Sequence, residues 1–478
     1  MAQTKPLKLV DAALIVTSGM IGSGIFIVSA DMSRILGGPG WLLLAWIISG
    51  VMTVFAALSY GELAGMFPAA GGQYVYLKEA YNPLTGFLYG WSLFAVVQSG
   101  TIAAVAVAFA KFTGVLYEPF SEKNILLTLG SFKISAAQIL AIFSVLVLTL
   151  INAQGINYGK IINRFFTSTK LIALFGIIVL GIFFFANSDV WNNNLSHFWD
   201  YSTTTQNEDG SWTSHPLTSI GLMTAMGVAL VGSLFSSDAW NNVTFIAGEI
   251  DEPKKNIPRS LLIGTFVVTL LYLLANIAYL KLLPFFGNAN GTDVLSRGLQ
   301  FPLNDRVGTA AATMIFSDKA AYIMAVLIMI STFGCNNGIV LASVRVYQSM
   351  AKDGLFFDKM KHNNKHGVPG FALWVQFVWA SLLCLSGQYG NLLDFVMFAV
   401  MLFYIFTVAG IFILRKKQPD TPRPYKAFGY PVIPALYILF AIAFCVNLLY
   451  MKPFYAAVGL GIVLLGVPVY FFWKKQLE

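Results

Sequence analysis

The stretch TSGMIGSGIF at residues 17–26 lies inside the first apolar segment of the chain and decides how that segment folds. It places three glycines, Gly19, Gly22 and Gly24, within six residues. Each glycine costs a helix about 1 kcal/mol relative to alanine, so the sequence predicts that a helix unwinds here. Inside a membrane, unwinding is tolerated only where protein or a watery cavity meets the freed backbone groups. Freed amides form a cradle for a carboxylate, which makes this break a candidate binding site.

The composition is that of a polytopic membrane protein. The 478 residues are 57% hydrophobic and only 11% charged, whereas about a quarter of an average soluble chain is charged. A bilayer-spanning helix needs roughly 20 apolar residues, and the chain supplies about twelve such segments. The first is long and lacks a small-x-small cleavage site, so we expect it to be retained. The expected spans are residues 9–30, 40–66, 84–113, 134–153, 163–186, 219–247, 260–284, 320–347, 370–387, 391–414, 432–450 and 454–473.

Basic residues alternate between loops and predict the orientation. They gather at residues 5–8, 160–164, 254–259, 345–365, 415–426 and 474–475. Because cytoplasmic loops carry an excess of Lys and Arg, we expect these loops and both termini on the cytoplasmic side of the plasma (inner) membrane. Loop 187–217 carries four acidic residues and no lysine or arginine, so we expect it outside. The net charge of +8 is scattered between apolar segments, which predicts the lipid bilayer and no nucleic acid as partner.

A second discontinuity, GSLFSSDAW, interrupts the sixth span at residues 232–240. An aspartate at a membrane centre costs about 2.5–3.5 kcal/mol on insertion scales, so we expect Asp238 to face a cavity. Spans one and six are equivalent if residues 9–187 and 218–414 form two inverted five-helix repeats, followed by two accessory helices at 432–473. Paired interrupted spans point to a transporter site. The alternative is that each break is a packing kink where small residues let helices approach.

The connection at residues 66–83 differs from the other loops. Gly71 and Gly72 indicate a turn, and the aromatic-rich sequence after them predicts a short helix at the cytoplasmic surface. The alternative is a loop that simply connects the two spans.

Several motifs together resemble the amino acid-polyamine-organocation superfamily and, within it, the L-amino-acid transporter branch. They appear in the same order as in that branch, between about residues 9 and 430. The resemblance implies an all-α fold of about twelve transmembrane helices, with two five-helix inverted repeats and broken helices one and six, that moves amino acids by alternating access. The motifs are GSGIF at 22–26, FSSDAWN at 235–241, GEI at 248–250, NIPR at 256–259, STFGCNNG at 331–338 and ASVR at 342–345.

The resemblance also implies how the substrate is held. The amides around Ser23 and Gly24 would bind its carboxylate, and the carbonyls of Ile21, Phe235 and Ser236 would accept from its ammonium group. A helix carries a partial positive charge at its N-terminal end and a partial negative charge at its C-terminal end. The backbone chemistry therefore agrees with the implied roles.

Further residues receive roles from the same resemblance. Gly22 lies in the same turn, and Phe235 stands where the family places an aromatic gate, although an ordinary core or lipid-facing phenylalanine is the alternative. Lys170 lies deep in span five, and in many sodium-independent members a lysine here takes the place of a sodium ion. Ser331 and Thr332 would be its neighbours in span eight. Snorkelling from a helix end is the other interpretation of Lys170.

Two questions about substrate and coupling stay open. A neutral L-amino acid is the first expectation, while Asp238 also fits a cationic side chain unless it is protonated. Obligatory exchange is the first expectation for the mechanism. Proton-coupled symport, with Lys170 or Asp238 titrating, is the alternative.

The sequence lacks the features expected of a membrane enzyme or of a channel. A membrane enzyme needs a cluster of reactive side chains within the spans, yet His197, His215, His362 and His366 all fall in loops. A channel needs a continuous polar pore lining or a repeated filter segment, and neither is visible. The sequence therefore predicts no enzyme, no metal site and no cofactor.

The positions of the cysteines indicate whether the protein can form a disulfide with a partner subunit. Cys335, Cys384 and Cys445 lie in or beside apolar stretches, where cysteine is usually a small packing residue. Animal members of the family carry a cysteine between spans three and four that links to a heavy subunit, but residues 112–133 contain none. We expect no disulfide-linked heavy subunit, and the sequence does not decide between a monomer and a homodimer.

Overall fold

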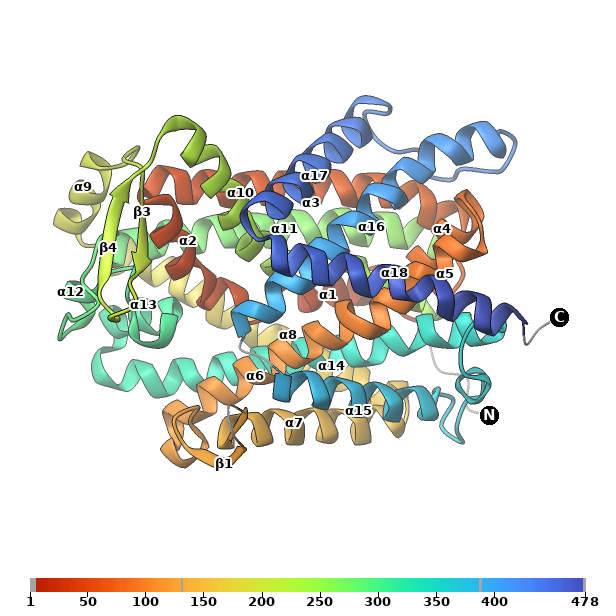
Figure 1. The fold of residues 1–478 in the computed structure, drawn as a ribbon, viewed down its shortest axis with the longest axis horizontal. Helices are drawn as coiled ribbons and strands as arrows, with labels where there is room; N and C mark the ends of the chain where they lie inside the picture. Colours follow the sequence, from red (N-terminus) through yellow and green to blue (C-terminus); the bar gives the residue numbers. More distant parts are fainter. Residues whose placement is uncertain (1–5, 130–131, 387–388, 476–478) are drawn as a thin grey trace.

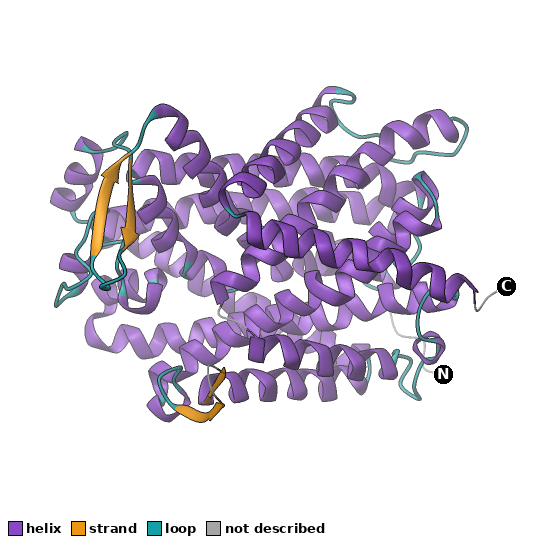
Figure 2. Ribbon diagram, viewed as in Figure 1, coloured by secondary structure: helices purple, strands orange, loops and turns teal. Residues whose placement is uncertain are grey.

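The computed structural model describes residues 6–129, 132–386 and 389–475, which form a helical bundle (Figures 1 and 2). The first half contains helices α1 (Leu9–Met20), α2 (Val28–Leu36), α3 (Pro39–Met66), α4 (Gln73–Ala80), α5 (Pro83–Ser92), α6 (Gln98–Leu116), α7 (Ala136–Ala153), α8 (Ile156–Val179) and α9 (Ser188–Ser196). The second half contains α10 (Ser219–Ser236), α11 (Pro253–Leu282), α12 (Val294–Arg297), α13 (Val307–Phe316), α14 (Ala320–Lys352), α15 (Gly370–Ser386), α16 (Tyr389–Lys417), α17 (Val432–Met451) and α18 (Pro453–Lys475).

The expected all-α polytopic membrane fold is confirmed. Within the described residues, ten helices are long and apolar enough to cross a membrane. The other two expected spans are the first, which is divided into α1 and α2, and α15, an apolar helix of 17 residues. Helix α11 begins at Pro253, before the expected start of span seven near residue 260. Charged residues end an apolar segment, but they do not end a helix that continues beyond the bilayer.

Local sequence explains where several helices begin. The Asn82 side chain accepts a hydrogen bond from the amide of Thr85 at 2.9 Å, and Pro83 follows at the first helical position of α5. Ser135 and Gln138 form a reciprocal capping box at the start of α7. Such contacts satisfy amides that have no partner within the helix.

Two short hairpins lie outside the bundle. Strands β1 (Ile125–Leu129) and β2 (Phe132–Ser135) pair in one, and β3 (Ser202–Gln206) and β4 (Trp212–Pro216) in the other. The β3–β4 hairpin belongs to the acidic loop that we expected outside, and it lies near α2, α9 and α12 at one end of the molecule (Figure 1). Both chain termini lie at the opposite end.

The connection at residues 66–83 contains a short helix, α4. Gly71 and Gly72 adopt φ values of 110° and 45°, which favour glycine. A Cβ on Gly72 would also overlap the side chain of Thr244. Tyr74 and Leu77 are fully buried while Lys78 and Glu79 are partly exposed, so α4 packs one face against the bundle.

Candidate functional site

The first span breaks at the glycine-rich stretch, as the sequence predicted. Helix α1 ends at Met20, and Ile21 leaves the helical conformation with φ −77° and ψ 89°. A single 3₁₀ turn, η1 (Gly24–Phe26), follows before α2 resumes the span at Val28. The first amides of such a turn have no partner within it.

The sixth span breaks just before the aspartate. Helix α10 ends at Ser236, and Ala239 adopts a left-handed conformation with φ 63°. A 3₁₀ segment, η5 (Trp240–Glu249), continues the span. A positive φ is uncommon for alanine, so the surrounding structure holds this turn in place.

The two breaks are packed directly against each other. A Cβ on Gly24 would overlap the side chain of Ser236, and a Cβ on Gly19 would lie 3.1 Å from the Ala239 carbonyl oxygen. Ser236 is 3% exposed and Phe235 is 8% exposed. Glycine therefore allows close contact between the breaks as well as unwinding.

Side chains from other helices satisfy the carbonyls at the end of α1. Lys170 on α8 is fully buried, and its Nζ donates to the carbonyls of Ser18 at 2.5 Å and Ile21 at 2.7 Å. Ser331 Oγ on α14 donates to the Ile21 carbonyl at 3.3 Å. These carbonyls carry the partial negative charge of a helix C-terminus, so an ammonium group is electrostatically suited to this position.

Thr332, predicted beside Ser331, has different contacts. Its Oγ1 donates to the Ile328 carbonyl of its own helix at 2.9 Å. Cys335 lies nearer to the break, with Sγ 3.1 Å from the Gly19 carbonyl oxygen. The structure thus brings Lys170 and Ser331 together at Ile21, while the Thr332 hydroxyl bonds within α14.

Tyr272 on α11 is a site residue that the sequence reasoning missed. Its hydroxyl lies 2.8 Å from the carbonyl oxygen of Met20 and 3.0 Å from that of Ser236, the last residues of α1 and α10. On the same helix, Asn276 accepts from Ser29 at 2.7 Å. The available signal was the spacing of polar groups at positions 272, 276 and 279 of an otherwise apolar helix, which places them on one face.

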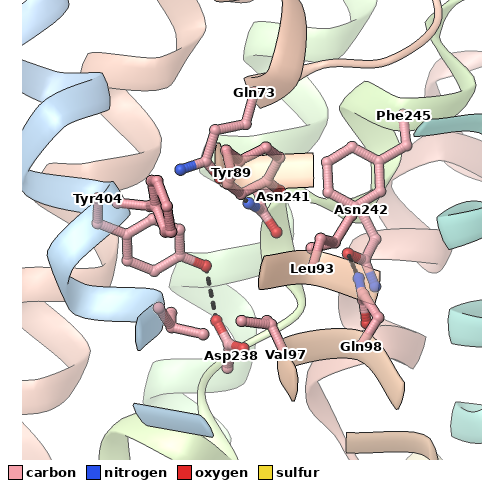
Figure 3. Close-up of a pocket in the computed structure, with 12 residues that line it drawn as sticks. Gln73, Tyr89, Leu93, Val97, Gln98, Asp238, Asn241, Asn242, Phe245 and Tyr404 are labelled. Carbon is pink, nitrogen blue, oxygen red and sulfur yellow. Dashed lines mark hydrogen bonds between the residues drawn. The ribbon is translucent and has the colours of Figure 1, made fainter. Parts of the chain in front are cut away.

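Asp238 faces a narrow cavity lined by both polar and apolar side chains, as predicted. The Tyr404 hydroxyl donates to Asp238 Oδ1 at 2.6 Å, and Gln98 Nε2 donates to Asn242 Oδ1 at 2.8 Å (Figure 3). The cavity measures about 20 Å³, and a second cavity of about 10 Å³ also touches Asp238 and Tyr404. Such volumes admit about one water molecule each, not an amino acid.

The other predicted substrate-binding residues lie outside the linings of these two cavities. Ile21, Ser23 and Ser236 are buried at the contact between the breaks. The Ile21 carbonyl accepts from Lys170 and Ser331, and the Ser236 carbonyl accepts from Tyr272. This conformation is therefore a closed one, in which side-chain donors hold carbonyls that were predicted to receive an ammonium group.

Both ends of the bundle are also closed by polar contacts. At the end that carries the termini, the amide of Leu7 donates to the Glu249 carbonyl at 2.9 Å, and Glu249 pairs with Arg345 at 3.0 Å. At the other end, Arg34 Nη1 lies 2.8 Å from Asp305 Oδ1. Among the described residues, no three His, Cys, Asp or Glu side chains are grouped so that they could hold a metal ion.

Comparison with known proteins places this geometry in a family. The family model for amino acid permeases matches residues 7–470. The large neutral amino acids transporter small subunit 2 of Homo sapiens is 29% identical, over 99% of this chain and 82% of that protein. The serine/threonine exchanger SteT of Bacillus subtilis (strain 168) is 28% identical, over 99% and 97%. The human cystine/glutamate transporter is 27% identical, over 99% and 86%. The chain is a multi-pass membrane protein that belongs to the amino acid permease family.

Proposed function

We propose that this protein is a sodium-independent transporter that exchanges neutral L-amino acids across the membrane by alternating access. The observation that carries the proposal is the contact between two broken helices, where the unwound ends of α1 and α10 meet in the middle of the bundle. Two of the three relatives agree, since one is named for large neutral amino acids and another for serine/threonine exchange, while the third is named for cystine and glutamate. Neither these names nor the fold suggests an enzyme.

The proposed substrate site lies between the breaks. When the half-helices separate, the amides of Ser23 and Gly24 bind the substrate carboxylate. The carbonyls of Ile21, Phe235 and Ser236 accept from its ammonium group. Gly22 keeps the turn free of side chains, and Phe235 closes over the bound amino acid as a gate. The chemistry supports this assignment, because helix starts favour anions and helix ends favour cations.

Lys170 explains the proposed independence from sodium. Its ammonium group contacts the Ser18 and Ile21 carbonyls, which are the hard oxygen ligands that a metal cation would take. Ser331 shares the Ile21 carbonyl, and we place Thr332 in the same coupling region of α14. Because the Lys170 ammonium group already occupies this position, no sodium ion needs to bind there.

In this proposal Asp238 does not pair with the substrate, because Tyr404 already donates to one of its oxygens in the closed form. The competing function is exchange that includes cationic amino acids, with Asp238 pairing to the side chain. Gln73, Gln98 and Asn242 around the cavity are neutral hydrogen-bonding groups, which suit either kind of substrate once the site has opened.

Residues 9–187 and 218–414 form the two inverted repeats, and residues 432–473 form the accessory helices. The protein lies in the plasma (inner) membrane with both termini in the cytoplasm. It functions as a monomer or homodimer, without a disulfide-linked heavy subunit. Its three cysteines are buried free thiols.

The proposal is tested with purified protein in liposomes. Uptake of labelled alanine, leucine and arginine is measured with and without unlabelled alanine inside, with and without sodium, and with and without a proton gradient. We expect uptake of alanine and leucine that requires internal amino acid and ignores sodium. Uptake into empty vesicles driven by an inward proton gradient would replace exchange with symport. Preferred arginine uptake would favour the cationic alternative.

A further inference from the structure

The turn that precedes α13 contacts two helices through consecutive side chains. Asp305 Oδ1 lies 2.8 Å from Arg34 Nη1 on α2. The next residue, Arg306, donates from Nη2 to the Lys111 carbonyl of α6 at 2.7 Å, and its guanidinium lies 5.4 Å from the ring centroid of Phe112. Asp305 and Arg306 therefore tie α2 to α6 at the end of the bundle opposite the chain termini.

Arg34 is held in a sheltered position. It is 7% exposed, and its Nη1 also donates to the Gln300 carbonyl at 2.6 Å. The rings of Trp212 on β4 and of Phe301 lie 5.3 and 5.9 Å from the guanidinium, within the range of cation–π attraction. Asp305 stays partly exposed, but because its partner is buried, water and salt screen this pair less than a fully exposed one.

The backbone of this turn is strained. Asn304 and Asp305 adopt φ values of 54° and 59°, and residues other than glycine visit this left-handed region mostly one at a time. The buried Nε of Arg306 also has no hydrogen-bond partner among the described residues. Strained conformations persist only where surrounding contacts hold them. The two side-chain contacts therefore hold the turn in place, and the turn can relax when they break.

The turn spans a route from the proposed substrate site to this end of the bundle. Helix α2 is the second half of the first broken span, and Gln98 at the start of α6 lines the cavity beside Asp238. Beyond the turn, α13 packs against the first break, because a Cβ on Gly308 would lie 2.7 Å from the Phe26 ring. A substrate that leaves toward this end must pass between α2 and α6, so the turn has to release one of them.

We propose that Asp305 and Arg306 are positioning residues that form an outer latch, which holds α2 against α6 and keeps the carrier closed toward the outside. This inference rests on the proposed function, in which this end faces outward and the two sides open in turn. When the latch releases, α2 moves away from α6 and the turn relaxes. Breaking either contact therefore favours the outward-open form.

Helix α2 itself supplies a matched control. Asp31 Oδ1 lies 3.4 Å from Arg34 Nη2, but both residues belong to α2. Asp31→Asn removes a carboxylate beside Arg34 without untying α2 from α6. Asp305→Asn removes the corresponding charge from the latch, and Arg306→Met removes the donor to α6.

The test compares the apparent KM for alanine exchange on the two faces of the membrane. Intact cells preloaded with alanine give the outer KM, and inside-out vesicles give the inner KM. We expect D305N and R306M to lower the outer KM and raise the inner KM by about two- to fivefold each, the equilibrium effect of a partly sheltered ion pair or of one hydrogen bond. D31N should keep both wild-type values. A residue with only a structural role would reduce the maximal rate and leave the ratio of the two KM values unchanged.

The outcomes separate the outer latch from the proposed function. If the wild type exchanges alanine but D305N and R306M keep the wild-type ratio of KM values, the latch is overturned while the exchanger stands. A shift of both KM values in the same direction would also overturn the latch, because it indicates altered substrate binding. A wild type without exchange overturns the proposed function itself. Since D305N alters a partly exposed side chain, it gives the readout if R306M does not fold.

Discussion

Lys170 on α8 donates a hydrogen bond to Ile21 in the first break, with the lysine Nζ 2.7 Å from the main-chain carbonyl oxygen of Ile21. The lysine is fully buried, and its second hydrogen bond reaches Ser18 on the last turn of α1. A buried charge is tolerated only when it is paired or hydrogen-bonded, and here the partners are helix-end carbonyls. The ammonium group thus stabilises an unwound backbone that would otherwise lack donors.

Removing this ammonium group is expected to impair transport strongly. Hydrogen bonds to charged groups contribute about 1.5–3 kcal/mol each, so K170A should lower the initial rate of alanine exchange by about tenfold or more. The rate is measured in liposomes at equal protein content. Lys255→Ala is the control, since Lys255 is exposed and pairs with neighbouring Glu252. Wild-type exchange by K170A would show that the Lys170 contacts are not needed for transport.

A larger residue at Gly24 is expected to block the site. Because a Cβ on Gly24 would overlap Ser236, Gly24→Val should separate the two breaks and reduce exchange to near background. Gly176→Ala in α8 is the matched control, since nothing lies within 4 Å of a Cβ at that position. Both proteins are compared by uptake rate and by size-exclusion profile. A folded G24V protein with normal uptake would contradict close contact between the breaks as a functional requirement.

Replacing Asp238 is expected to change selectivity more than overall rate. Asp238→Asn keeps the size of the side chain and an acceptor for Tyr404 but removes the negative charge. Arginine uptake should fall relative to alanine and leucine uptake in the variant. Tyr404→Phe frees the carboxylate and should shift the same ratio the other way. If both variants keep the wild-type ratios of the three substrates, Asp238 is not a specificity residue.

Glu62 supports a prediction about stability. It lies on α3 with 1% side-chain exposure, accepts from Arg415 at 2.9 and 2.6 Å, and accepts from the amide of Ala427 at 2.7 Å. Breaking a buried ion pair by removing one charge costs about 3–5 kcal/mol. Glu62→Gln should therefore lower the midpoint of thermal unfolding by several degrees in detergent. The exposed Glu252→Gln variant should unfold like the wild type, and a matching midpoint for E62Q would refute the role of this pair.

The spans and their breaks were predictable because they depend on local composition. Apolar runs of sufficient length identify membrane helices, and glycines or an aspartate within such runs identify where they unwind. The β3–β4 hairpin was not predicted. Its strands are short and polar, so they lack the alternation of apolar residues by which a strand is usually identified.

The contacts within the site were predictable only in part. Lys170 was noticed because a lysine is conspicuous inside an apolar segment. Tyr404 was missed, since a tyrosine in a membrane helix looks like any other aromatic residue until its hydroxyl is placed. Tyr272 shares a helix face with Asn276 and Tyr279, but the sequence does not show what that face contacts. The partners of Tyr272 are main-chain carbonyls on two other helices. No side chain in the sequence marks such acceptors, so only the packing of three helices reveals them.

In the proposed site, the substrate is held by its ammonium and carboxylate groups between the two breaks. The most direct measurement is competition against labelled alanine exchange by L-alanine, by ethylamine, which lacks the carboxylate, and by propionate, which lacks the ammonium group. We expect L-alanine to compete strongly and neither analogue to compete at the same concentration. Competition by ethylamine or propionate as strong as that by L-alanine would contradict it.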